Sequence, residues 1–137
     1  MNFVLDASVA LAWAFEDEGG GYPELVLEAL GRGEAVTSSL WPLEVSNGLV
    51  AAERRGRITP ADSSRFAALL LTLPIVVEPM DRRRVFEAAR LLAQRRGLSV
   101  YDAHYLELAA RLGMPLATLD RGLMAAAEAE GVGIFQG

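Results

Sequence analysis

The sequence predicts an α/β domain in which a central, mostly parallel sheet of five strands is flanked by helices. Short apolar segments alternate with helical segments along the chain, as expected for a parallel sheet covered on both faces. Hydrophobic residues make up 52% of the 137 residues, which is enough to form a buried core. No linker, repeat or low-complexity tract interrupts the pattern, so we expect residues 1–137 to form a single domain.

Five segments have the composition of buried strands. Ile75–Val77 is a good example, because all three of its residues are β-branched. The other segments are also short and apolar, and turn residues bound them. We expect strands at residues 2–5, 35–38, 75–77, 115–118 and 132–135.

The helical segments are delimited by capping residues, proline and glycine. Asp6 or Ser8 can cap the first helix. Pro42 lies in the first turn of another helix, where its missing N–H is tolerated. Gly97 and Gly113 follow expected helix ends. We expect helices at residues 9–16, 23–30, 41–55, 59–73, 81–96, 99–112 and 120–130.

Composition limits the function classes. The net charge is −5, so a nucleic acid would have to bind through a local basic patch or through bound cations. Cysteine is absent, which excludes disulfides and thiolate metal sites. No apolar run approaches the length of a membrane span and no signal peptide is evident, so we expect a cytoplasmic protein without membrane association.

Four acidic residues stand where strands end or helices begin. Asp6 and Asp120 follow expected strands, whereas Glu44 and Asp102 lie in the first turns of expected helices. Functional groups of an open α/β sheet gather beyond the carboxyl ends of the strands, so these side chains are candidates for one site. Two carboxylates about 4 Å apart repel by about 4 kcal/mol at an intermediate dielectric, so four together need a cation or raised pKa values. Oxygen ligands without thiols indicate Mg²⁺ or Mn²⁺.

Each acid also has an ordinary structural interpretation. Asp6 and Asp120 can act only as helix caps, and Glu44 can simply complement the helix dipole. Asp102 is harder to explain in this way, because the other residues of its helix are largely apolar. The joint placement of all four favours a shared site over four independent structural roles.

Other α/β families with an aspartate after the first strand lack support in this sequence. Response-regulator receivers and haloacid dehalogenase-type phosphatases normally need a lysine to neutralise the phosphate, and all 13 basic residues here are arginine. The residues after Asp6 do not form the Gly-x-Gly-x-x-Gly motif of a dinucleotide-binding fold. A Walker-type loop ending in lysine is also absent.

Four motifs, each containing one of the acids, together resemble a known family. They are Val4-Leu5-Asp6-Ala7-Ser8-Val9-Ala10, Glu44-Val45-Ser46-Asn47, Ser99-Val100-Tyr101-Asp102-Ala103 and Ala117-Thr118-Leu119-Asp120. Their order and approximate spacing are similar to those of PIN domains, and more narrowly of VapC-type toxins from toxin–antitoxin pairs. The resemblance covers the whole chain and implies a PIN-like three-layer sandwich. It also implies a Mg²⁺- or Mn²⁺-dependent endoribonuclease that acts on RNA and binds a cognate antitoxin protein.

The resemblance implies roles for particular side chains. The proposed metal ligands, directly or through water, are Asp6, Glu44, Asp102 and Asp120. Ser8 and Thr118 are candidates for hydroxyl contacts to metal-bound water, and Asn47 for orienting Glu44 or the substrate. For Ser8 the alternative is a helix cap, and for Asn47 it is an exposed polar position. Attack by water implies products with 5′-phosphate and 3′-hydroxyl ends.

Several other groups are assigned more conservatively. Arg121 is the arginine best placed to contact RNA phosphates, and Trp41 either packs in the core or stacks on a base. We expect a packing or surface role for His104, which faces away from Asp102 on a helix. The apolar segment 66–71 suggests a self-association surface, in agreement with the homodimer that the resemblance implies.

Two alternative functions remain open at this point. One is a PIN-like nuclease of RNA processing or DNA repair that has no antitoxin. The other is a non-catalytic PIN binding module. The presence of all four acids favours an enzyme over the binding module.

Overall fold

The computed structural model describes residues 2–18 and 20–137. Its sheet, over these residues, has four strands in the order β3-β2-β1-β4, and every pairing is parallel. The strands are β1 (Asn2–Leu5), β2 (Glu34–Thr37), β3 (Ile75–Val77) and β4 (Leu116–Ala117). Because all pairings are parallel, the carboxyl ends of the strands lie at one edge of the sheet.

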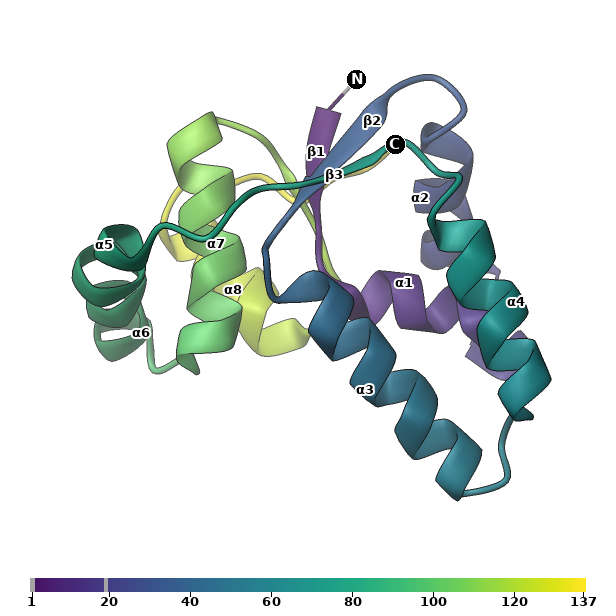
Figure 1. Ribbon diagram of the computed structural model, residues 1–137. Coiled ribbons are helices and arrows are strands. Elements are labelled where there is room, and N and C mark those ends of the chain that lie inside the picture. The colour runs from purple at the N-terminus through teal and green to yellow at the C-terminus, as the bar shows by residue number, and fades with distance from the viewer. Residues whose placement is uncertain (1, 19) are drawn as a thin grey trace.

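Helices cover both sides of this sheet. In Figure 1, α5, α6 and α7 lie to the left of the strands, and α2 and α4 lie to the right. The α-helices are α1 (Ala7–Ala14), α2 (Gly21–Ala29), α3 (Trp41–Arg54), α4 (Pro60–Leu70), α5 (Arg82–Arg84), α6 (Arg90–Arg96), α7 (Val100–Leu112) and α8 (Arg121–Ala129). A 3₁₀ turn, η1 (Glu16–Glu18), follows α1, and a π-helical turn, η2 (Val85–Ala89), joins α5 to α6.

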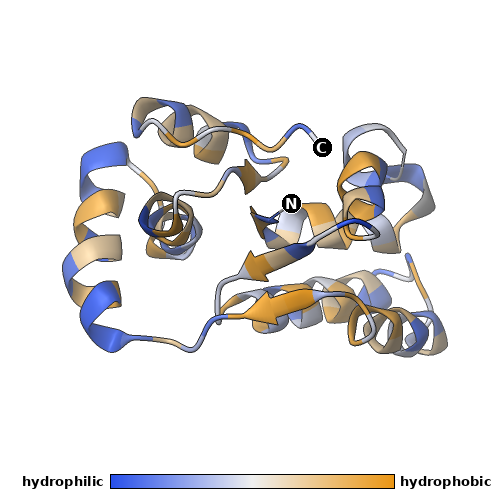
Figure 2. Cartoon of the chain, turned by 90° about the horizontal axis from the view of Figure 1, so that it is seen from above, coloured by the Kyte–Doolittle hydropathy of each residue, from blue (hydrophilic) through white to orange (hydrophobic). Residues whose placement is uncertain are grey.

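The core lies between the sheet and its covering helices. Phe3, Val4 and Leu5 of β1 are fully buried, as expected for the inner strand of a two-sided parallel sheet. The ring of Phe3 stacks on Phe135, with centroids 4.0 Å apart, and this contact fixes the C-terminal segment against β1. Figure 2 shows the same division, with hydrophobic residues on the strands and hydrophilic residues at both ends of the outer segment formed by α5, η2 and α6.

Local sequence signals account for the helix boundaries. Thr59 and Asp62 form a reciprocal capping box at the start of α4. The hydroxyl of Ser99 accepts a hydrogen bond of 3.1 Å from the backbone N–H of Asp102 and so caps α7. Gly97 and Gly113 end α6 and α7 with φ values of 66°, a left-handed conformation that favours glycine.

The predicted fold class is confirmed, but the expected fifth strand is not formed. Residues 132–135 contribute only an isolated parallel bridge, between Ile134 and Leu116. The partner strand β4 has just two residues, so the backbone of Leu116 supplies the two ladder hydrogen bonds, to Gly133 and from Phe135. The predicted helix 81–96 is also divided, because a π turn separates α5 from α6.

Within the described ranges, no helix is long and apolar enough to cross a bilayer.

Candidate active site

The four predicted acids line one open pocket of about 370 Å³ at the carboxyl edge of the sheet. Asp6 lies between β1 and α1, and Glu44 lies in the first turn of α3. Asp102 lies in the first turn of α7, and Asp120 occupies the N-cap of α8. The remaining lining residues are Ala7, Ser8, Leu11, Asn47 and Gly48. Parallel strand order therefore brings together carboxylates that are far apart in the sequence.

Asp6 is held by two hydroxyl groups and does not cap α1. Its Oδ2 accepts hydrogen bonds from Ser8 Oγ at 2.6 Å and from Thr118 Oγ1 at 2.8 Å. Those hydroxyls are themselves oriented, because Ser8 Oγ accepts from the backbone N–H of Leu119 and Thr118 Oγ1 accepts from that of Asp120, both at 3.0 Å. The side chain makes no capping bond to the helix. Asp6 therefore occupies the N-cap position of α1 without a side-chain capping bond, so capping alone does not explain this residue, and its carboxylate has a fixed orientation beside the pocket.

Burial changes the ionisation of the Asp6 carboxyl group. Asp6 is only 4% exposed. Loss of solvation raises its pKa, and the hydrogen bonds from Ser8 and Thr118 lower it in part. The network therefore favours the carboxylate form without fully compensating for burial.

Glu44 has a buried oxygen without a hydrogen-bond partner. Oε1 of Glu44 is inaccessible to solvent and unpaired within the described residues. Burial raises the pKa of Glu44, the nearby Tyr105 hydroxyl lowers it, and repulsion from Asp6 and Asp102 raises it further. The Tyr105 hydroxyl is likewise buried and, among the described residues, reaches no partner at hydrogen-bond distance, although it lies near enough to the Glu44 carboxylate to stabilise its charged form. A bound cation would satisfy a buried, unpaired carboxylate oxygen of this kind, because the oxygen could coordinate the ion.

Asp102 and Asp120 complete the acidic lining. Burial raises the pKa of Asp102, and repulsion from Asp120 and Asp6 adds to the effect. Asp120 also caps α8, since its Oδ1 accepts a hydrogen bond of 2.9 Å from the N–H of Leu123. The cap interpretation is therefore correct for Asp120, although the same side chain lines the pocket.

The donor set fits a hard divalent cation. All four groups are oxygen donors, and none of them forms a salt bridge among the described side chains. In the described part of the chain, however, no three acidic or histidine side chains already surround a common ion position. An ion in this pocket would therefore be held partly through water, or after rotation of one or more carboxylates.

The predicted supporting residues differ in their surroundings. Ser8 and Thr118 bind Asp6 directly, so the structure gives both hydroxyls a role in positioning that carboxylate. Asn47 is exposed and lines the pocket, but no described contact joins it to Glu44. It therefore remains a candidate for contact with the substrate.

The two residues predicted to contact substrate, Trp41 and Arg121, differ in their exposure to solvent. Trp41 is 7% exposed and belongs to the core, which supports packing and excludes it as an exposed base-stacking ring. Arg121 is exposed at the first position of α8, directly after Asp120. It is not among the residues that line the pocket, so its contact with an RNA phosphate stays a prediction.

Sequence reasoning missed Leu11 and Gly48 in the pocket lining. A Cβ added to Gly48 would lie 2.7 Å from both methyl carbons of Leu11, so α1 and α3 approach closely at this point. Gly48 is four residues after Glu44 and thus on the same helix face, which is the sequence signal that could have identified it. Leu11 carried no comparable signal.

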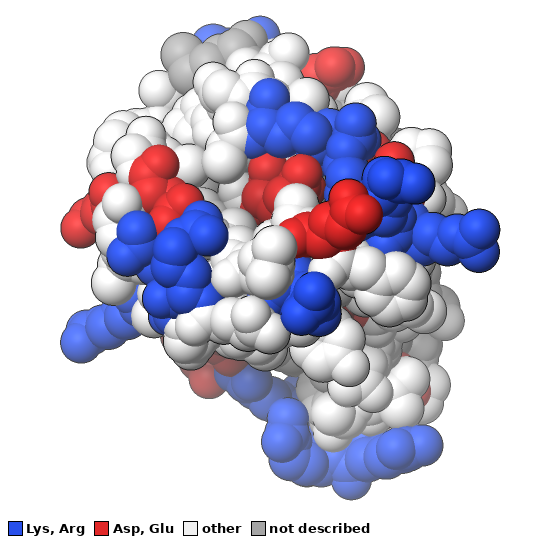
Figure 3. Space-filling view, turned by 90° about the vertical axis from the view of Figure 1, so that its left-hand side faces the viewer, with Lys and Arg blue, Asp and Glu red and all other residues white. Residues whose placement is uncertain are grey.

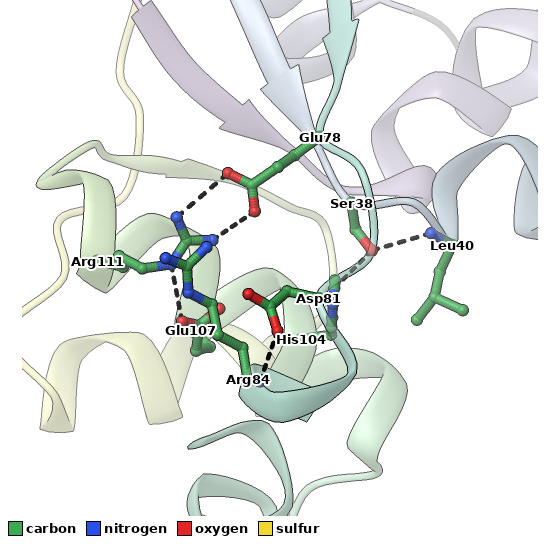
Figure 4. A network of polar contacts seen from close by, with 8 residues as sticks. All are labelled: Ser38, Leu40, Glu78, Asp81, Arg84, His104, Glu107 and Arg111. Atoms are coloured by element: carbon green, nitrogen blue, oxygen red, sulfur yellow. Dashed lines mark hydrogen bonds and ion pairs between the residues drawn. The ribbon is translucent and has the colours of Figure 1, made fainter. Parts of the chain in front are cut away.

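His104 lies away from the acidic pocket, as predicted. It is 8% exposed, and its Nδ1 lies 2.7 Å from Ser38 Oγ, which also accepts from the N–H of Leu40. Figure 4 shows this pair beside an ion-paired group in which Arg111 contacts Glu78 and Glu107.

Burial lowers the pKa of His104 and so favours the neutral ring. These contacts give His104 a packing role between the start of α3 and α7.

Many arginines on the face that carries α5, α6 and α7 are paired with acids. Figure 3 shows the two kinds of charge interspersed on this face. Arg95 and Arg96 both contact Glu130, and Arg83 lies 3.7 Å from Glu87. Arg83, Arg95 and Arg96 are therefore engaged in ion pairs on this face.

Comparison with known proteins identifies the family. A family model for the PIN domain matches residues 3–129. The chain belongs to the PIN domain family. This PIN domain is 32% identical to Ribonuclease VapC3 of Pyrobaculum aerophilum over 123 residues, which cover 90% of this chain and 92% of the relative. The resemblance to VapC-type PIN domains is therefore confirmed.

Two crystal structures have a similar fold. PAE2754 from Pyrobaculum aerophilum matches this PIN domain with a TM-score of 0.69 and 26% identity, over 92% of this chain and 84% of the other. FitAcB from Neisseria gonorrhoeae matches with a TM-score of 0.66 and 16% identity, over 99% and 97% of the two chains. The second match supports the PIN fold alone.

Proposed function

We propose that this PIN domain is a metal-dependent endoribonuclease and the toxin component of a type II toxin–antitoxin pair. The observation that carries the proposal is the single pocket lined by four carboxylates from four separate elements. Three of these carboxyl groups have raised pKa values, so a bound cation would stabilise their ionised forms. Similarity to a relative named Ribonuclease VapC3 supports RNA as the substrate.

The proposed cofactor is Mg²⁺ or Mn²⁺, held by Asp6, Glu44, Asp102 and Asp120 directly or through water. Such an ion, when bound, supplies Lewis-acid chemistry that acidifies water and offsets negative charge on a phosphodiester. The unpaired Oε1 of Glu44 and the all-oxygen donor set support this assignment.

The protein's own residues perform the positioning. Ser8 and Thr118 fix one oxygen of Asp6, which preorganises this carboxylate before substrate binds. Asn47, exposed in the pocket lining, and Arg121, exposed directly after Asp120 in the sequence, would bind phosphate or sugar oxygens of RNA. Hydrolysis by water, and not by the RNA 2′-hydroxyl, would leave 5′-phosphate and 3′-hydroxyl ends.

The proposed partners are a cognate antitoxin and a second copy of this chain. Leu69 and Leu71, in the segment expected to self-associate, are 51% and 89% exposed. Exposed apolar side chains at the end of one helix support an interface between copies. An antitoxin would lay an apolar segment on the toxin and place a basic side chain among the carboxylates.

The test is incubation of purified protein with total RNA in the presence of Mg²⁺ or Mn²⁺, followed by mapping of the cut ends. We expect cleavage that chelator abolishes, with 5′-phosphate ends. Expression should also arrest growth, and co-expression of a small protein encoded next to this chain should relieve the arrest. Cleavage without such relief would favour a PIN nuclease that has no antitoxin, and absence of cleavage would favour a binding module.

A further inference from the structure

The acidic pocket does not end at the carboxylates. A second pocket, of about 380 Å³, shares Ser8, Leu11, Gly48 and Asp120 with the first. It extends between α1 and α3 toward the end of α3. Its additional lining residues are Phe15, Glu18, Arg55, Arg57 and Leu119. Together the two pockets form one groove, here called the α1–α3 groove.

The sequence of α3 explains the shape and charge of this groove. Glu44, Gly48 and Arg55 line the two pockets and are spaced at i, i+4 and i+11, so they lie on one helix face within about 40°. Gly48, where Leu11 of α1 packs closely against α3, lines the middle of the groove, and Arg55 stands at the far end. Eleven residues of helix separate Glu44 from Arg55 by about 16 Å along the axis.

The two arginines that line the groove differ in their ion pairing. Arg57 is held by Asp17 and Glu18 and covers the ring of Phe15, with its Cζ 4.1 Å from the ring centroid. Arg55 is exposed and forms no salt bridge with any side chain that the structure describes. Arg55 is thus the groove's cation that remains available to a ligand.

We infer that the α1–α3 groove holds single-stranded RNA running away from the acidic pocket, with Arg55 binding a backbone phosphate several nucleotides from the cut. This inference rests on the proposed ribonuclease function. Leu11 and Leu119 offer apolar surface to bases, while Arg55 supplies the charge complementary to phosphate. At about 3.4 Å per stacked nucleotide, a span of about 16 Å corresponds to about five nucleotides. Because the net charge is −5, bulk attraction does not favour RNA, and a local cation such as Arg55 would supply part of the attraction.

The test compares Arg55→Gln with Arg54→Gln. Arg54 is also exposed and forms no described salt bridge, but it is one residue earlier on α3 and lies outside the groove lining. Binding of a labelled single-stranded RNA of about twelve nucleotides is measured over a range of salt concentrations, in an Asp102→Asn background that prevents cutting. Arg55→Gln should weaken binding about five- to tenfold and reduce the salt slope by about 0.7, the value for one phosphate contact to a single strand. Arg54→Gln should leave both unchanged.

RNA length provides a second measurement. An oligonucleotide of about three nucleotides, which reaches about 10 Å at 3.4 Å per nucleotide, is too short to extend from the acids to Arg55 and should bind both variants equally. If Arg55→Gln leaves the affinity and salt slope of the longer RNA unchanged, the inference is overturned. The groove would then be assigned to binding of a protein partner. Arg55-dependent binding in a protein whose wild type cuts no RNA would retain the groove and reject the nuclease proposal.

Discussion

The Thr118 hydroxyl donates a hydrogen bond of 2.8 Å to Oδ2 of Asp6, a residue 112 positions away in the sequence. The contact exists because β1 and β4 are neighbours, with Val4 paired to Leu116 and Leu5 to Ala117. The residues directly after the two strands therefore meet at the carboxyl edge of the sheet. This relationship joins the first and last parts of the chain at the candidate active site.

Replacing Thr118 with valine should remove this hydrogen bond while nearly preserving the side-chain shape. The pKa of Asp6 should rise further, because one of the two hydroxyls that lower it is lost. The acidic limb of the pH–rate profile should move to higher pH, and the free energy of unfolding should fall by about 1–3 kcal/mol. Thr72→Val is the control, since the Thr72 hydroxyl bonds only the nearby Leu69 carbonyl on the surface. Equal pH profiles for both variants would contradict the role given to Thr118.

Metal-free protein should become more stable as the pH falls from neutrality toward about 5. Asp6, Glu44 and Asp102 have raised pKa values, so the folded state takes up protons before the unfolded chain does. Their contribution to stability is lost as the pH rises through these folded-state pKa values. At still lower pH the Glu130 carboxyl has the opposite effect on stability. Its arginine partners lower its pKa to about 2, so its contribution to stability is lost as it becomes protonated.

Mn²⁺ should offset this loss at neutral pH. Thermal unfolding with and without Mn²⁺ should show a clear rise in Tm at neutral pH and a smaller one near pH 5, where protons compete for the carboxylates. Asp102→Asn should reduce the neutral-pH rise. A Tm that is insensitive to Mn²⁺ at every pH would argue against a metal site in this pocket.

The fold was largely predictable because its signals are local. Apolar segments, caps and terminal glycines located the strands and helices, and Asp6 and Asp120 were identified by their place after strands. The failed prediction concerns residues 132–135, where the apolar pattern is that of a strand but the neighbouring β4 offers only two residues to pair with. Strand formation there depends on a partner that one sequence segment does not reveal.

For the candidate site, the acids that line the pocket could be predicted from the sequence, but the hydrogen bonds that hold them could not. The contacts of Ser8 and Thr118 with Asp6 follow from the pairing of β1 with β4, and strand order cannot be read from one sequence. Trp41 shows a second limit of prediction from sequence. An aromatic residue near Glu44 in the sequence is compatible with either base stacking or core packing until its burial is known.

Gly48→Ala tests the close approach of α1 and α3. The new Cβ would lie 2.7 Å from the Leu11 methyl carbons, so the half-buried Leu11 side chain, which lines both pockets of the groove, must shift. Alanine favours the helix by up to about 1 kcal/mol, which offsets part of the clash. RNA cleavage should therefore fall severalfold while Tm changes little, and adding Leu11→Ala should restore cleavage. A large loss of Tm with proportional loss of cleavage would show a purely structural effect.

Leu71→Ser tests the proposed self-association. Leu71 is 89% exposed, so the substitution should leave the folded protomer intact while weakening an interface that buries this side chain. Sedimentation equilibrium should show a shift from dimer toward monomer. Leu91→Ser, at a 47% exposed position on α6, is the control. If Leu91→Ser dissociates the dimer and Leu71→Ser does not, the interface lies elsewhere.

The central claim is that the four carboxylates act together on RNA with a divalent ion, and Asp102→Asn tests it most directly. Asp102 is half-buried, and the substitution preserves its shape, so the Ser99 cap and the fold should remain. We predict that the variant unfolds at nearly the same temperature as the wild type but loses at least about 100-fold in Mn²⁺-dependent cleavage of single-stranded RNA. Undiminished cleavage by the folded Asp102→Asn variant would contradict the claim.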